Sequence, residues 1–349
     1  MSVFRSVGFA LAAALCGAAL SMQTARAETT TLRFMHYVSP DSANPKYFLG
    51  PWAEKIARVS GGRLKIEIYP FMQLGGKPAE IFDMVRDGAI DGGWITPGYQ
   101  PGRFPKTEVL ELPFVVTKSA EEASKAAWVY TQKHLQADFA EVHLIAVHMT
   151  GAGVIHKKGR PVATVEDLKG LKLRGPSRAA TTLLEELGAI PIGMPVPAFP
   201  EALSKGVVDG GAITWELAPS LKLDELTDSH TDVAGDKALY NLFLAWGINK
   251  ARYEALPEDL QAILDANSGF MASAWAGRAQ DQGDAIGRQA MVDAGNEITV
   301  LSEEESARIR LAADKVIAAW IRDTAAKGHD AEALLRDARA AVELTRTVR

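Results

Sequence analysis

Cysteine is nearly absent from this chain of 349 residues. The single Cys16 lies in an apolar stretch that we interpret as part of a removable leader, so the mature protein would contain none. Leu15 precedes Cys16, where a lipid anchor would need a small residue. Disulfides, thiol catalysis and zinc–thiolate sites are therefore excluded from the mature chain.

The signatures of common catalytic and nucleotide-binding sites are also missing. Neither a Gly-x-Ser-x-Gly elbow nor a Gly-x4-Gly-Lys loop occurs. Gly151-Ala-Gly153 begins like a dinucleotide-binding turn, but His156 stands where the third glycine belongs. The seven histidines are scattered, and His143 and His148 fall on opposite faces of a predicted strand. We therefore expect no enzymatic activity, no cofactor and no metal.

Positive charge is in slight deficit, with 38 Lys and Arg against 43 Asp and Glu and a formal net charge of −5. A mildly acidic surface argues against nucleic acid and anionic lipid as partners. Against this background, a local basic site for an anionic ligand would stand out.

The N-terminus has the order of parts of a secretory signal peptide. A short segment with Arg5 precedes the apolar run from Val7 to Leu20, and Ala25-Arg26-Ala27 gives a small-x-small cleavage pattern. The alternative, a membrane anchor, would need about 18 to 20 apolar residues. We expect residues 1–27 to be removed on export and the mature protein to be periplasmic.

The mature chain alternates strand and helix patterns, which predicts an α/β fold with mainly parallel sheets. The expected strands and helices of a first unit lie within residues 31–96, and those of a second within residues 171–214. The units close alike, since Gly88-Ala-Ile-Asp-Gly-Gly-Trp-Ile-Thr96 matches Gly206-Val-Val-Asp-Gly-Gly-Ala-Ile-Thr214 at six of nine positions. The match indicates two similar lobes facing each other; the alternative is coincidence between glycine-rich turns.

The C-terminal third is predicted to be helical. A pattern from Pro257 to about Gly295 would be long enough to span both lobes at about 1.5 Å per residue. Ile298 to Leu301 reads as a strand, and Ser302 with Glu305 forms a capping-box pattern before a last amphipathic helix. We expect residues 28–150 plus about 240–275 to form lobe 1. Residues 151–239 plus about 276–349 would form lobe 2 and the C-terminal helices.

Several segments, in order, carry a resemblance to a known family. They are Gly61-Gly-Arg-Leu-Lys-Ile-Glu-Ile-Tyr-Pro70, Gln73-Leu-Gly-Gly76, Gly88-Ala-Ile-Asp91, Leu112-Pro-Phe114, Asp167-Leu-Lys-Gly-Leu-Lys-Leu-Arg174, Leu187-Gly-Ala189, Glu201-Ala-Leu203, Gly206-Val-Val-Asp-Gly210 and Leu256-Pro257. The chain resembles the dicarboxylate-binding type of solute-binding subunit of tripartite ATP-independent periplasmic (TRAP) transporters. The resemblance implies a periplasmic-binding-protein fold, with two α/β lobes joined by hinge strands and a long spanning helix. It also implies an ion-driven membrane permease as partner.

In that family, the arginine that ends the Leu-Lys-Leu-Arg strand pairs with the ligand carboxylate, and here that residue is Arg174. Ligands in open α/β sheets bind at the carboxyl ends of strands, and a guanidinium meets a carboxylate with two parallel hydrogen bonds. Arg178, one turn further on, is a candidate second cation. The position of a further arginine found in many members is Gly153 here.

The remaining candidate ligand contacts lie at predicted strand ends. Trp215 would give the pocket a flat apolar wall, as in members that bind aromatic or 2-oxo acids, with Thr214 as a hydrogen-bond donor. Further candidates are Trp94 in the matching unit and His36 and Tyr37 after the first strand. The alternative for these aromatic residues is a place in the core.

We therefore predict a monomeric binding protein for a small organic monocarboxylate, with aromatic and 2-oxo acids as candidate classes. One alternative is a C4-dicarboxylate, held with help from Arg178 or His36. A second is an exported enzyme, such as a lyase, on the same fold. A third, the sensing ectodomain of a receptor, lacks a downstream membrane span in the sequence.

Overall fold

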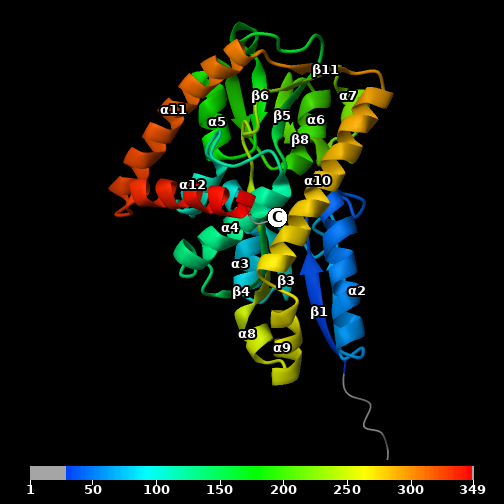
Figure 1. Cartoon of the computed structure of the whole chain (residues 1–349). Helices are drawn as coiled ribbons and strands as arrows, with labels where there is room; N and C mark the ends of the chain where they lie inside the picture. The colour runs from blue at the N-terminus through cyan, green and yellow to red at the C-terminus, as the bar shows by residue number, and fades with distance from the viewer. Residues whose placement is uncertain (1–28, 348–349) are drawn as a thin grey trace, which may run out of the picture.

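The computed structural model describes residues 29–347 and shows two lobes, each built around its own β-sheet (Figure 1). The α/β architecture predicted from the sequence is confirmed. The predicted leader, with Cys16, lies outside the described residues. Within residues 29–347, each helix is too short or too polar to cross a bilayer.

The first lobe contains a five-stranded sheet formed by β1 (Thr30–Met35), β2 (Leu64–Tyr69), β3 (Gly92–Ile95), β4 (Val142–Met149) and β10 (Phe243–Asn249). The order across the sheet is β2-β1-β3-β10-β4. Strands β2, β1 and β3 are parallel, and β10 is antiparallel to both of its neighbours. Because β10 comes late in the chain, it returns to this sheet only after the chain has passed through the other lobe.

The second lobe contains a six-stranded sheet formed by β5 (Gly153–Lys157), β6 (Lys172–Gly175), β7 (Ile190–Gly193), β8 (Gly210–Thr214), β9 (Ser229–Asp232) and β11 (Glu297–Val300). The order is β11-β9-β5-β8-β6-β7. Strands β7, β6 and β8 are parallel and β5 runs antiparallel to β8, which repeats the arrangement of β2, β1, β3 and β10.

Helices cover the sheets and connect the lobes. Helix α2 packs on β2, α3 on β3 and α4 on β4, while α5 packs on β6 and β7. The bounds are α2 (Gly50–Val59), α3 (Ile81–Arg86), α4 (Ala120–His134), α5 (Arg178–Glu186), α6 (Phe199–Ser204), α7 (Leu223–Leu226), α8 (Lys250–Glu254), α9 (Glu258–Ala266), α10 (Phe270–Asp293), α11 (Glu303–Ala326) and α12 (Ala331–Thr347).

The helix predicted from Pro257 to about Gly295 is divided into α9 and α10. The break falls at Gly269, whose φ of +84° lies outside the helical region. Helix α10 contacts α4 and β4 of the first lobe and β11 and α7 of the second, so it spans both lobes as expected (Figure 1).

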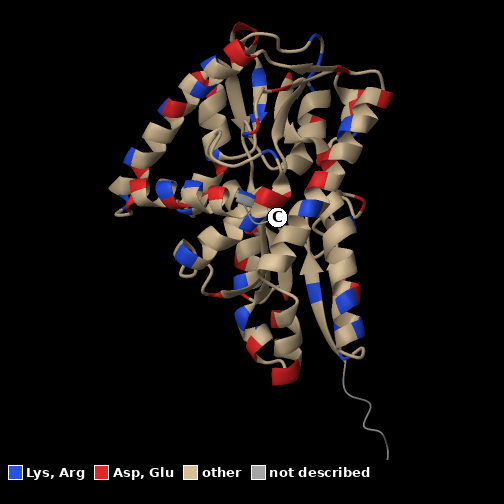
Figure 2. Ribbon diagram, in the orientation of Figure 1, with Lys and Arg blue, Asp and Glu red and all other residues tan. Residues whose placement is uncertain are grey.

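The C-terminal segment forms two helices joined by a turn at Gly328. Ser302 caps α11 by accepting a hydrogen bond from the N–H of Glu305, but the Glu305 carboxylate accepts from the N–H of Val165 instead of completing the box. Helix α12 packs on α4 beside the first sheet. Its Thr345 hydroxyl donates to the carbonyl of Glu122 there. Acidic and basic residues alternate along α11 and α12 (Figure 2).

Two extended segments cross between the lobes and pair with each other. The N–H of Thr150 donates to the carbonyl of Leu242, and the N–H of Gly153 donates to the carbonyl of Tyr240. The side chain of Asn241 donates to the carbonyls of Thr150 and Gly151. These segments and α10 are the covalent links that hold the two sheets beside each other.

Candidate functional site

A pocket lies between the lobes, where the carboxyl ends of β3 and β8 face each other beside the crossing segments. Apolar and aromatic side chains form most of its wall, and the polar groups are few. Its lining residues are Tyr37, Val38, Trp94, Tyr99, Thr150, Arg174, Val196, Ile213, Thr214, Glu216, Leu217, Tyr240, Leu242, Leu244 and Gln280. A mostly apolar cleft with a few placed polar groups is typical of a small-molecule site.

Arg174 is the one Lys, Arg or His side chain in this lining, as far as the described residues show. It is almost fully buried, with 2% of its surface exposed. Its Nε donates to the carbonyl of Met194 at 3.0 Å and its Nη1 donates to the carbonyl of Ala212 at 2.8 Å. Its Nη2 has no hydrogen-bond partner among the described residues. The guanidinium is thus held in a fixed orientation and retains donor capacity for an anion.

The backbone around Arg174 is shaped to bring it there. A Cβ at Gly211, its partner on β8, would lie 2.8 Å from the Cβ of Arg174, so a larger residue would displace that side chain. The strand ends in a turn at Ser177, whose hydroxyl accepts from the N–H of Ala180 and caps α5. The close approach of Gly211 and the helix cap at Ser177 therefore hold the end of the Leu-Lys-Leu-Arg strand at the pocket.

Thr214 and Tyr240 complete the wall around Arg174. The hydroxyl of Thr214 is buried and has no hydrogen-bond partner among the described residues. Gly153 pairs with Thr214 in the sheet, and a Cβ at Gly153 would lie 1.7 Å from a ring carbon of Tyr240. The phenol ring of Tyr240 therefore occupies the space into which a side chain at position 153 would extend.

The first lobe contributes an aromatic wall. The ring of Tyr37 stacks on that of Trp94 at 5.4 Å, and the Tyr37 hydroxyl lies 2.7 Å from that of Thr96. Burial raises the pKa of Tyr37 well above its usual range, so the phenol stays neutral. The indole of Trp94 donates to Nε2 of His148 at 2.8 Å, which fixes the ring. Tyr99 reaches across the pocket, where its hydroxyl accepts from the N–H of Val196.

Three of the seven residues proposed from the sequence do not line the pocket. His36 is buried behind it, edge-on to the ring of Trp94, and burial lowers the pKa of His36 to about 4. Trp215 packs against the rings of His156 and His230 of the second sheet. Both therefore occupy the core positions that were the alternative.

Arg178, the third, forms ion pairs instead of facing the pocket. Its guanidinium binds the buried carboxylate of Glu108 at 2.5 Å and that of Asp323 at 2.9 Å. Glu108 lies in the short helix Thr107–Glu111 of the first lobe. The pair therefore joins the lobes outside the pocket.

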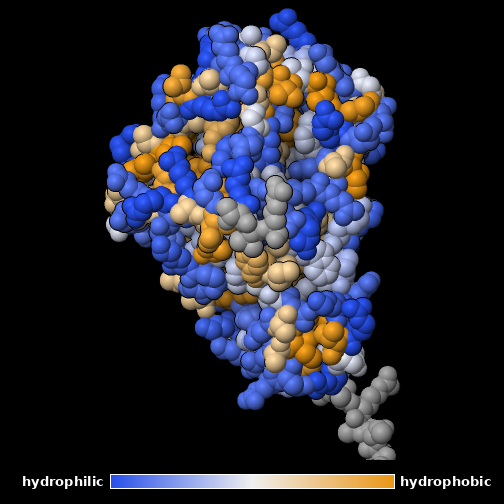
Figure 3. All heavy atoms as spheres, viewed as in Figure 1, coloured by the Kyte–Doolittle hydropathy of each residue, from blue (hydrophilic) through white to orange (hydrophobic). Residues whose placement is uncertain are grey.

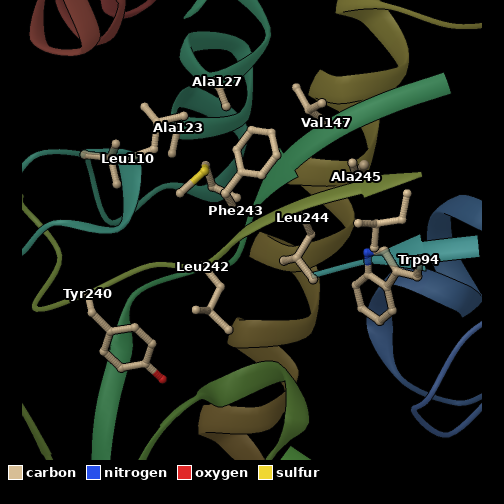
Figure 4. Close-up of a cluster of buried hydrophobic side chains, with 14 of the residues drawn as sticks. Trp94, Leu110, Ala123, Ala127, Val147, Tyr240, Leu242, Phe243, Leu244 and Ala245 are labelled. Atoms are coloured by element: carbon tan, nitrogen blue, oxygen red, sulfur yellow. The ribbon is translucent and has the colours of Figure 1, made fainter. Parts of the chain in front are cut away.

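Several lining residues were not predicted from the sequence. Leu242 and Leu244 lie on one side of the chain entering β10, toward Tyr240 and Trp94, and Phe243 points to the other side into the core (Figure 4). Glu216 and Gln280 come from separate elements, the turn Trp215–Leu217 and helix α10. An alternating pattern could have identified the leucines, but only the packing of α10 on this turn places Gln280 and Glu216 in the same lining.

Comparison with known proteins agrees with this geometry. A solute-binding protein of a TRAP transporter from Rhodoferax ferrireducens, whose structure contains copurified benzoate, is 44% identical. The match covers 92% of this chain and 99% of that one, with a TM-score of 0.89. A marine metagenome TRAP protein in complex with 3-hydroxybenzoate is 39% identical over 91% of this chain and 99% of its own, also with a TM-score of 0.89. The outer membrane transporter protein TsaT of Comamonas testosteroni is 26% identical over 90% of this chain and 93% of its own.

The family model for bacterial extracellular solute-binding proteins of family 7 matches residues 34–323. This span includes the second sheet, the first sheet apart from residues 30–33 of β1, the crossing segments, α10 and every residue that lines the pocket. The match therefore covers most of the two-lobe unit, and the chain belongs to family 7 of the bacterial extracellular solute-binding proteins, the solute-binding proteins of TRAP transporters.

Proposed function

We propose that this protein captures an aromatic monocarboxylate between its lobes and delivers it to a TRAP permease in the membrane. The observation that carries the proposal is Arg174, a buried guanidinium with two nitrogens fixed by carbonyls and a third without a partner. A buried cation is costly unless an anion meets it, and a ligand carboxylate would meet it.

The rest of the lining supports an aromatic ligand. Tyr37 and Trp94 offer stacked rings, and Leu242 and Leu244 add an apolar floor. Aromatic rings pack favourably against such surfaces in offset or edge-on arrangements. The similar proteins that contain benzoate and 3-hydroxybenzoate point to the same class.

A C4-dicarboxylate finds less support in this pocket. Its second carboxylate would need a second cation, and the candidates are occupied or neutral. Arg178 is paired with Glu108 and Asp323, and His36 is neutral and lies outside the lining. At Gly153, the ring of Tyr240 fills the space that an arginine would use.

The biological setting is part of the same proposal. Residues 1–27 direct export and are removed after Ala27, so the mature protein works as a monomer in the periplasm. It binds its ligand without changing it. N-terminal sequencing of the secreted protein should begin at or near Glu28, and a retained Met1 would contradict the processing.

Titration calorimetry against benzoate, mandelate, pyruvate and succinate tests the ligand class. Saturating benzoate should raise the melting temperature, since a ligand at about 100 times its Kd stabilises the native state by about 2.7 kcal/mol. Benzoate recovered after incubation should be chemically unchanged. Tighter binding of succinate than of benzoate would replace this proposal with the C4-dicarboxylate alternative.

A further inference from the structure

Two further polar side chains line the pocket and have groups without partners. Oε2 of Glu216 and both Nε2 and Oε1 of Gln280 are buried and lack hydrogen-bond partners among the described residues. Glu216 is 5% exposed and Gln280 is fully buried. Buried polar groups are almost always hydrogen-bonded in native proteins, so a cluster that is not indicates a missing partner.

The position of these groups is set by close packing of α10 on the turn that follows β8. The N–H of Glu216 donates to the carboxylate of Asp284 at 2.8 Å, and a Cβ at Gly283 would lie 2.8 Å from the Cβ of Glu216. Gln280 precedes Asp284 by one turn of the same helix. This packing fixes the backbone on both sides and places both side chains in the lining of the pocket.

The chemistry of the cluster selects the group that would fill it. Burial raises the pKa of Glu216 to about 8, so its carboxyl is mainly protonated at neutral pH. Asp284, beside it, also has a pKa raised by burial and by Glu216. A protonated carboxyl and an amide each donate and accept hydrogen bonds. A hydroxyl, which also does both, matches them without adding charge, whereas a second carboxylate would face the acidic pair.

We infer that Glu216 and Gln280 form a second polar subsite that hydrogen-bonds a hydroxyl group of the ligand. The preferred ligand is then an aromatic monocarboxylate with a ring or side-chain hydroxyl, held by Arg174 through the carboxylate and by this subsite through the hydroxyl. The inference rests on the proposed function, which requires only that an aromatic monocarboxylate binds.

Calorimetry on the unaltered protein tests the subsite first. The ligands are benzoate, its three hydroxy isomers, mandelate with phenylacetate, and 3-aminobenzoate. At least one hydroxy acid should bind about tenfold or more tightly than its parent without the hydroxyl. Equal binding of all hydroxy acids and their parents would overturn the subsite and leave the proposed function standing. Failure of every aromatic acid to bind would overturn both.

A matched pair of variants on α10 identifies the residues. Gln280→Leu removes the buried amide, and Gln282→Leu makes the same change at an exposed position two residues further on. Gln280→Leu should reduce the hydroxyl preference to about twofold or less, because the hydroxy acid loses a hydrogen bond that benzoate does not make. Gln282→Leu should keep the full preference. An equal loss for benzoate and the hydroxy acid in Gln280→Leu would overturn the assignment.

Glu216→Gln separates hydrogen bonding from charge. The amide keeps a donor and an acceptor, so the preference for the hydroxy acid should persist within a few-fold. If the variant instead loses the hydroxy acid and the unaltered protein binds 3-aminobenzoate most tightly, the subsite serves an amino group and the inference is wrong.

Discussion

The two closing segments of the lobes, Gly88–Thr96 and Gly206–Thr214, share a backbone arrangement but present different chemistry to the pocket. The carboxylate of Asp91 accepts the N–H of Arg33 at 2.8 Å, and that of Asp209 accepts the N–H of Lys172 at the same distance. In each case the Asp joins the start of its strand to the neighbouring parallel strand.

The glycines that follow also have matching roles. A Cβ at Gly93 would lie 2.6 Å from Ile81 on α3, and a Cβ at Gly211 would lie 2.7 Å from Phe199 on α6. Each glycine lets the preceding helix pack closely on the sheet. The similarity found in the sequence is therefore a shared way of packing helix on strand.

The side chains beside these glycines are where the lobes differ. Met35 pairs with Gly93 in the first lobe, and Arg174 pairs with Gly211 at the same register in the second. Trp94 stands in the first lobe where the second has Ala212, whose carbonyl accepts from Arg174. One scaffold therefore supplies an aromatic wall in the first lobe and a buried arginine in the second.

The largest expected effect comes from giving the second lobe the residue of the first. Arg174→Met should weaken carboxylate binding by about 2 to 5 kcal/mol, roughly 30-fold to several thousand-fold, because the ligand carboxylate would be buried without its partner. Without ligand, the variant should be at least as stable as the parent protein, because the substitution removes a buried cation that has no anionic partner. Calorimetry and thermal melts measure both, with exposed Arg58→Met as the control. Unchanged affinity in a folded Arg174→Met would place the anchor elsewhere.

Gly153→Ala should force the ring of Tyr240 out of its place. Overpacking of this kind typically costs about 1 to 3 kcal/mol, and the displaced ring should also weaken ligand binding. Gly193→Ala is the control, because a Cβ there meets no atom within 4 Å. In urea denaturation, the double variant Gly153→Ala/Tyr240→Ala should be more stable than the sum of the single effects predicts. Strict additivity would show that the glycine and the ring do not interact.

A buried acid in each lobe should make stability fall as pH rises. Burial raises the pKa of Glu111 and of Glu216 to about 8, from the usual range near 4.5. The native state therefore holds more protons than the unfolded state between these values, and each linked proton lowers the unfolding free energy by up to about 1.4 kcal/mol per pH unit.

The buried histidines have lowered pKa values and oppose this trend in acid, so the window from pH 6.5 to 8 is the informative one. Glu111→Gln should flatten the slope there, measured by urea denaturation at several pH values. A parallel slope in the variant would mean that Glu111 does not stay protonated.

Thr96 and Thr214, the last residues of the two matching segments, should respond to substitution in opposite ways. Thr96→Val loses a hydrogen bond to Tyr37 and should destabilise the ligand-free protein by about 0.5 to 1.5 kcal/mol. Thr214→Val removes a buried hydroxyl without a partner, so the melting temperature should hold or rise. Its carboxylate affinity should instead fall about two- to tenfold. Equal melting shifts in the two variants would contradict this division.

The smallest effect is expected at Arg178. Its side chain is 31% exposed, so the ion pair with Glu108 should contribute about 1 kcal/mol or less to the contact between the lobes. Arg178→Ala should lower the affinity for every ligand by the same few-fold factor, and this loss should be smaller at high salt. A loss of affinity confined to dicarboxylates would instead indicate that Arg178 contacts the ligand.

The outside of the two lobes is more polar than their interior. On the face shown in Figure 3, apolar side chains lie in scattered groups among hydrophilic ones. The interior differs, since Leu32, Phe34, Ile213 and Phe243 are almost fully buried. The alternation of Leu32 and Phe34 with more polar neighbours is what made β1 visible in the sequence.

The pocket could be predicted only in part. Arg174, Thr214, Tyr37 and Trp94 line it, and each stands at or just after a strand end that local patterns revealed. Trp215 occupies an equally suggestive position but packs toward His156 and His230. A one-residue step along the chain after a strand changes the direction of a side chain, and sequence does not record that step.

The sequence by itself determined the strands and helices of the two repeated units, their closing segments and the Leu-Lys-Leu-Arg strand, because these depend on periodicity and on neighbours close in the chain. Only the tertiary structure decided that Arg178 binds Glu108, that Tyr240 covers Gly153 and that Gln280 and Glu216 line the same pocket. The members of these pairs are 64 to 87 positions apart in the chain. Their partners are selected by how the lobes and α10 pack, and no local pattern carries that information.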